Sequence, residues 1–131
     1  MFAGNVRTLF CAIAAVAPKL VARGEGFIAG IASAPALTGH AHGSGVYAAA
    51  KSAVATLLHS LDADLAGTRV DVACVYPMAA VDTPANRRDL PGADASTLVD
   101  PDEIAEALYF AATRSDRGRI VDLVIHPRRA N

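Results

Sequence analysis

The chain contains no tryptophan and few aromatic residues of any kind. Aromatic side chains make up 5% of its 131 residues, whereas hydrophobic residues make up 53%. Much of this hydrophobic content is alanine, so the sequence predicts closely packed helices and no large aromatic cluster. A chain of this length can bury a substantial core, and we expect a single domain over residues 1–131.

An excess of charge of either sign is also lacking. The formal net charge is −1, and the longest basic runs are the pairs Arg87-Arg88 and Arg128-Arg129. A protein that binds nucleic acid usually carries a concentrated basic surface to contact the phosphates. We therefore expect no nucleic-acid partner.

Cysteine is scarce and shows no motif. Cys11 and Cys74 lie far apart, each inside an apolar segment. This pattern predicts two reduced, buried thiols in a cytoplasmic protein, and it provides no spacing for a disulfide or a metal site.

Long hydrophobic runs are missing as well. The apolar run from Leu9 to Ala17 follows Arg7 and ends in small residues, which is one feature of a signal peptide. It lacks a leucine block and fits a buried amphipathic helix equally well. No segment approaches the roughly 20 apolar residues that cross a bilayer, so we expect no membrane partner.

Hydrophobic periodicity predicts alternating helices and strands. Residues 5–23 have apolar side chains at helical intervals before Gly24, and residues 46–65 form an apolar stripe before Gly67. A third helix is expected from the N-cap Asp100 to about Thr113. Short apolar runs predict buried strands at residues 26–32, 70–76 and 119–125, with loops at 33–45 and 78–101. This order predicts an α/β fold with about three parallel strands.

Tyr47 and Lys51 lie four residues apart on the second predicted helix, so their side chains share one face. A phenol ionises near pH 10, and a neighbouring ammonium group lowers its pKa toward the range that acid–base catalysis needs. The Tyr-x-x-x-Lys spacing alone is weak evidence, since a solvated pair on a helix surface would look the same.

Other residues occur in a characteristic order around this pair. A strand ends at Ser33, a loop follows, and the helix then begins with Tyr47 and Lys51, while Asn5 lies in the preceding helix. In this order the sequence resembles the short-chain dehydrogenase/reductase family. The resemblance implies that Ser33 hydrogen-bonds the substrate oxygen, that Tyr47 passes the proton, and that Lys51 lowers the tyrosine pKa and holds the nicotinamide ribose. It also implies that Asn5 completes a proton relay.

The segment after the second strand extends the resemblance. The family usually has Pro-Gly, an aliphatic residue and a threonine that contacts the nicotinamide; this chain has Pro77 and Thr83 with Met78 in place of glycine and one extra residue. Residues 82–94 resemble the dihydropteridine reductase branch. The resemblance thus implies binding of NAD or NADP through Tyr47, Lys51, Pro77 and Thr83, and a small carbonyl or alcohol substrate.

The same resemblance defines what part of the family fold to expect. It implies a partial Rossmann-like, doubly wound domain that corresponds to the C-terminal half and lacks the glycine-rich half that binds the dinucleotide. We therefore expect weak cofactor binding by this piece alone and an exposed apolar edge on its first strand. The resemblance also implies a homo-oligomer formed through the two alanine-rich helices. A non-catalytic remnant that acts as an interaction module is the alternative.

Three further patterns suggest other sites. Residues 38–45 spell T-G-x-x-x-G-x-G, the family's phosphate-binding turn, but the segment before them is interrupted by Pro35 and is a poor strand. We expect a loop beside the substrate. His40 and His42 could suggest a metal site, but no third ligand lies at a suitable spacing from them. Ser33 lacks the G-x-S-x-G turn of a hydrolase nucleophile.

Overall fold

A parallel sheet lies at the centre of the computed structural model, which describes residues 1–128. Its three strands are β1 (Gly26–Ile31), β2 (Val70–Pro77) and β3 (Asp122–Ile125), in the spatial order β1-β2-β3. Ala29 pairs with Ala73, and Cys74 pairs with Asp122. These strands confirm the predicted α/β fold with a parallel sheet.

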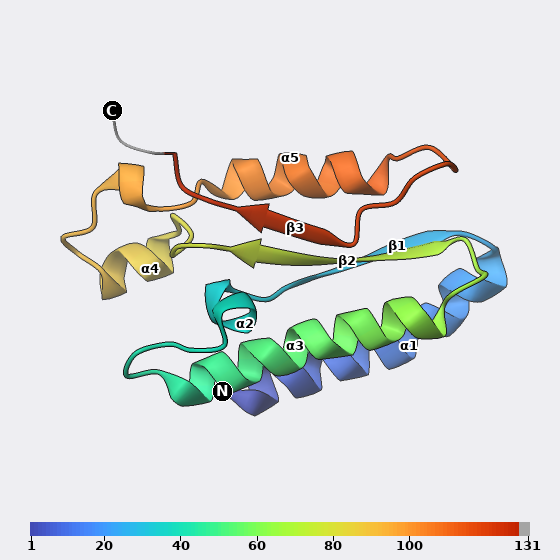
Figure 1. Cartoon of the computed structure of the whole chain (residues 1–131), viewed down its shortest axis with the longest axis horizontal. Coiled ribbons are helices and arrows are strands. Elements are labelled where there is room, and N and C mark those ends of the chain that lie inside the picture. The colour runs from blue at the N-terminus through green and yellow to red at the C-terminus, as the bar shows by residue number, and fades with distance from the viewer. Residues whose placement is uncertain (129–131) are drawn as a thin grey trace.

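Helices cover both faces of the sheet, as Figure 1 shows. The π-helical turn η1 (Ala3–Arg7) packs against α3 (Gly45–Asp64) and continues into α1 (Thr8–Arg23), which packs against β1. Helix α5 (Pro101–Ala112) packs on the other face, over β2 and β3. Strand β1 is an edge strand, and the side chain of Ile31 on it is 46% exposed.

The central strand β2 supplies most of the core. Its apolar side chains are buried on both faces, which is typical of a strand with helices on either side. On the α3 face the core contains Leu58, Val72 and Tyr76. On the α5 face it contains Val75 and Ile104.

The predicted helix ends are confirmed where the sequence has specific terminating residues. Gly24 ends α1 with φ +91°, a left-handed conformation that favours glycine. At the start of α5 the carboxylate of Asp100 accepts a hydrogen bond from the backbone N–H of Asp102 at 2.9 Å. This cap satisfies one of the otherwise unpaired donors of the first turn.

Both predicted loops contain short helices that the sequence analysis missed. Residues 33–45 include α2 (Ala34–Thr38), and residues 78–101 include α4 (Pro84–Asp89) and η2 (Ala95–Thr97). Prolines in the first turns of α2 and α4 are compatible with helix starts, and helices of five or six residues are too short to show a periodicity. Strand β3 also begins later than predicted, at Asp122.

The predicted burial of the N-terminal helix is wrong. Among its residues only Ala17 is buried, because the helix contacts the rest of the protein along one side. Cys11 is consequently exposed, and only Cys74 is a buried thiol. Val46, expected in the apolar stripe of the next helix, is 64% exposed at the start of α3.

The same helix corrects the expectation about membrane-spanning length. Because η1 and α1 are continuous, Ala3–Arg23 forms a 21-residue helix that contains an 18-residue stretch with a mean hydropathy of 1.4, long and apolar enough to cross a bilayer by length and composition. Signal sequences and core helices of soluble proteins meet the same criterion, so this finding does not assign the helix to a membrane.

Candidate active site

A pocket of about 670 Å³ opens at the carboxyl ends of β1 and β2. Four residues singled out in the sequence line it together: Ser33 after β1, Tyr47 and Lys51 on α3, and Pro77 at the end of β2. Ligands of open parallel α/β sheets bind at this end of the strands. The fold therefore brings these four residues to one place from three elements.

Lys51 is held by the edge strand. Its ammonium Nζ donates a hydrogen bond to the carbonyl oxygen of Ile31 at 3.0 Å and lies 5.9 Å from the centre of the Tyr47 ring. Partial burial lowers the pKa of Lys51 below its ordinary value, while the neighbouring Cys74 thiol acts in the opposite direction. One of the three ammonium donors is used by Ile31, so two remain for other acceptors.

Asn5 does not line the pocket. It lies in the π-helical turn η1, where its side-chain Nδ2 donates to the carbonyl oxygen of Met1 at 2.9 Å. Such a widened turn inside an α-helix distorts the helix locally and is frequent at functional sites. η1 packs against α3, the helix that carries Tyr47 and Lys51.

Thr83 also stands outside the pocket lining. Its hydroxyl oxygen accepts from the backbone N–H of Asn86 at 3.2 Å and so caps α4. Asn86 is the residue that faces the pocket, with its amide Nδ2 bound to the carbonyl oxygen of Val81 at 2.7 Å. The sequence analysis missed Asn86, although the Thr-Pro pair before it is a typical helix start.

In the glycine-containing segment 38–45, residues 39–44 form a loop beside the pocket, and the two end residues belong to α2 and α3. The helix α2 precedes it in place of a strand, so it cannot form the strand–turn–helix unit that binds a pyrophosphate. Gly39 and Gly43 adopt φ angles of +75° and +69°. His42 lines the pocket, whereas His40 bonds the carbonyl oxygen of Thr38 through Nδ1 at 3.0 Å.

Comparisons with known proteins identify the family. The family model for short chain dehydrogenases matches residues 1–93. An uncharacterized oxidoreductase of Staphylococcus haemolyticus is 30% identical over 123 residues, which cover 94% of this chain and 52% of that protein. The chain belongs to the short-chain dehydrogenase/reductase family.

Solved structures agree with this assignment. A short chain dehydrogenase/reductase family protein superposes with a TM-score of 0.83 at 31% identity, over 97% of this chain and 55% of that one. The closed form of a serine dehydrogenase complexed with NADP⁺ gives a TM-score of 0.77 at 27% identity, over 94% of this chain and 52% of that one. The chain thus spans about half the length of these relatives, as expected for one half of a family member.

Proposed function

We propose that this chain contributes the catalytic side chains of an NAD(P)-dependent oxidoreductase that interconverts a small alcohol and the corresponding carbonyl compound. The observation that carries the proposal is the convergence of Ser33, Tyr47 and Lys51 on one pocket at the carboxyl ends of the strands. The family assignment gives this convergence a chemical context.

The residues present fit the nicotinamide end of such a cofactor. Lys51 has two ammonium donors free for the hydroxyls of a ribose, and Pro77 forms part of the pocket wall after β2. When bound, the cofactor supplies or accepts a hydride at its nicotinamide ring. The Thr83 hydroxyl accepts the capping hydrogen bond of α4, so it would contact the cofactor as a hydrogen-bond donor.

The side chains of this chain orient the substrate and transfer the proton. Ser33 donates a hydrogen bond to the substrate oxygen and orients it. Tyr47 gives its phenolic proton to that oxygen during carbonyl reduction and takes it back during alcohol oxidation. The ammonium of Lys51 stabilises the phenolate that forms, since it lies on the same face of α3. Asn5 affects these groups indirectly, because η1, the turn that contains it, packs against α3.

The phosphate end of a dinucleotide has no counterpart in this part of the chain. Among residues 1–128 no glycine-rich turn connects a strand to a helix. We therefore propose that the piece by itself binds NADH or NADPH weakly, through the nicotinamide half alone. The choice between NAD and NADP depends on contacts outside this pocket.

Fluorescence titration of NADH and NADPH tests the proposal directly. We expect weak binding that Lys51→Ala reduces about tenfold or more, because an ammonium-to-hydroxyl interaction is lost. Tyr47→Phe should leave binding nearly unchanged and remove any oxidation of the cofactor by carbonyl compounds.

Lys19→Ala is the matched control, because Lys19 is the chain's other lysine and lies exposed on α1. Equal losses for the two lysine variants would contradict a ribose site at Lys51. Tight binding by the unmodified chain would contradict the proposed weakness of the isolated piece.

We also propose that the protein works in the cytoplasm and assembles with a second copy through α1 and α3. The exposed apolar side chains of Phe10, Val16 and Val21 on α1 support this assembly, since they would lose contact with water there. The alternative of a non-catalytic interaction module is less well supported, because it assigns no role to the convergence of Ser33, Tyr47 and Lys51.

A further inference from the structure

A second hollow lies at the opposite end of the sheet from the candidate active site. It has a volume of about 470 Å³ and is formed by the turn before β2 and the segment that joins α5 to β3. All of its lining residues are polar, charged or glycine, so an apolar ligand would find no matching surface. Four arginines and two aspartates contribute its charges: Arg69, Arg114, Arg117, Arg119, Asp71 and Asp116.

Two of the arginines already have carboxylate partners. Arg69 Nη2 lies 3.0 Å from Asp116 Oδ1, and Arg119 pairs with Asp62 on α3. In the first pair both side chains are more than 60% exposed, at 64% and 78%, so this pair is weakly held and open to water. The pairs connect the segment before β3 to the start of β2 and to α3.

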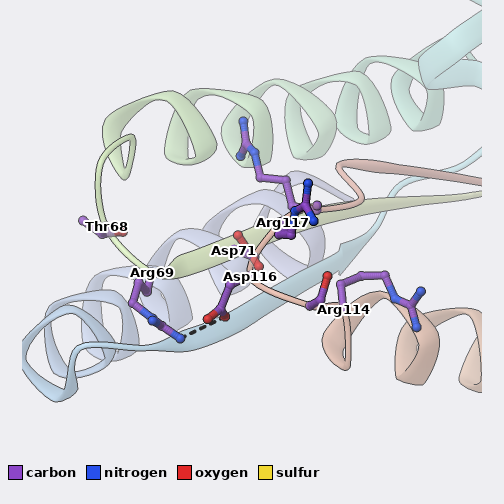
Figure 2. Close-up of a pocket in the computed structure, with 9 residues that line it drawn as sticks. Thr68, Arg69, Asp71, Arg114, Asp116 and Arg117 are labelled. Carbon is purple, nitrogen blue, oxygen red and sulfur yellow. Dashed lines mark hydrogen bonds and ion pairs between the residues drawn. The ribbon is translucent and has the colours of Figure 1, made fainter.

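The other two arginines have no carboxylate within ion-pair distance among residues 1–128. Figure 2 shows Arg114 extending away from the Arg69–Asp116 pair. Arg114 Nε donates to the carbonyl oxygen of Phe110 at 2.8 Å, and its guanidinium group lies 3.5 Å from the centre of the Phe110 ring. This stacking orders the side chain and leaves its terminal amino groups free to donate.

The hollow therefore holds a local positive excess in a protein whose net charge is −1. Once the Arg69–Asp116 and Arg119–Asp62 pairs are set aside, the lining of the hollow keeps two arginines, Arg114 and Arg117, and one carboxylate, Asp71. Guanidinium groups match the oxygen geometry of phosphates, and a small open volume suits a compact anion. We propose that this hollow binds a phosphate group, either as free phosphate or pyrophosphate or as the phosphate of a larger metabolite.

Calorimetric titration of the full chain with pyrophosphate at low ionic strength provides the test, with amide chemical shifts to locate binding. We expect saturable binding with shifts concentrated at residues 114–119. Arg114→Ala and Arg117→Ala should each weaken binding about fivefold, as loss of one nearby unit charge predicts. Asp71→Asn should strengthen it by a similar factor, an effect that loss of folding cannot produce.

Arg88→Ala is the matched control, because Arg88 is exposed on α4 outside the lining of this hollow. Equal weakening by Arg88→Ala and Arg117→Ala, shifts outside the hollow, or no gain from Asp71→Asn would overturn the proposal. Parallel titrations with inorganic phosphate and ribose 5-phosphate distinguish the two sources. Tighter binding of the ester supports a phosphorylated metabolite, and tighter binding of the free ion supports phosphate itself.

Discussion

At the scale of single residues, Tyr76 stands out as a polar side chain in the core. It is 1% exposed, and its hydroxyl lies 3.3 Å from Nε2 of His59, which in turn lies 2.8 Å from a carboxylate oxygen of Asp122. The three residues belong to β2, α3 and β3, so the contacts join elements that are distant in sequence. Burial is the main reason that the pKa of the Tyr76 phenol is raised well above its ordinary value.

The raised pKa of Tyr76 predicts an alkaline loss of stability. Above about pH 10 the unfolded chain releases the phenol proton while the folded chain retains it, so the free energy of unfolding falls as pH rises. Tyr76→Phe should reduce this slope by up to about 1.4 kcal/mol per pH unit. Urea unfolding between about pH 8 and pH 11 measures the slope.

Comparison of the wild-type protein with the Tyr76→Phe variant isolates the contribution of the Tyr76 phenol. As pH rises, Cys74, whose pKa is raised, lowers the free energy of unfolding, and Lys51, whose pKa is lowered, raises it. Both residues remain in the Tyr76→Phe variant, so their contributions cancel in the comparison. Tyr109→Phe is the control, because Tyr109 is 73% exposed. The same slope in wild type and Tyr76→Phe would show that the buried phenol does not control alkaline stability.

At the scale of elements, the closeness of α3 to β1 depends on a glycine. A Cβ atom at Gly30 would lie 2.6 Å from Cδ1 of Leu58, whose side chain is fully buried. The absence of a side chain at this position lets the helix approach the strand. This approach matters for the site, because Lys51 on α3 reaches the carbonyl oxygen of Ile31 at the end of β1.

Gly30→Ala is therefore expected to destabilise the protein by about 1–3 kcal/mol, since the fully buried Leu58 side chain would have to shift within the core. Denaturant unfolding gives the value. Gly92→Ala, at a position with no atom within 4 Å of the added Cβ, should change stability by less than about 0.5 kcal/mol. Combining Gly30→Ala with Leu58→Val should recover part of the loss, and a purely additive double variant would argue against direct contact.

The sequence predicted the elements with strong periodicity or clear end signals and missed those without. Strands β1 and β2 and the helices α3 and α5 follow from apolar patterns and from Gly24, Asp100 and Pro101. The short helices α2 and α4 lack a periodicity because they have only five and six residues, and the Thr83-Pro84 pair was the one start signal for α4. Missing α4 is also why the site prediction named Thr83, whose hydroxyl caps this helix, and left out Asn86, which lines the pocket from the same helix.

Site residues show the same division. The order of Ser33, Tyr47 and Lys51 along the chain, through its resemblance to the family, predicted a shared site, and all three residues line one pocket. Burial was harder to predict for α1. A helical apolar pattern identifies a helix, but it does not say how much of that helix this chain alone covers.

At the scale of the whole molecule, apolar surface is unevenly distributed. Phe10, Val16 and Val21 on α1 are 57%, 44% and 41% exposed, although they belong to a helix that packs on the core along its other side. Exposed apolar groups gathered on one helix indicate a surface that associates with another molecule. In the proposed assembly this surface meets the same surface of a second copy.

Phe10→Glu should weaken such an assembly about tenfold or more, because a charge would then be desolvated at the interface. Light scattering over a range of concentrations measures the change. Leu37→Glu is the control, since Leu37 is similarly exposed, at 48%, but lies on α2. A monomer at all concentrations before substitution would refute the proposed self-association.

The two hollows lie at opposite ends of the same strands, one formed by segments that follow β1 and β2, the other by segments that precede β2 and β3. Connecting segments tolerate substitution better than the buried strands between them. Mutations can therefore accumulate at either end without disturbing the other, and the proposed substrate site and the proposed anion site can diverge independently among descendants of this sequence.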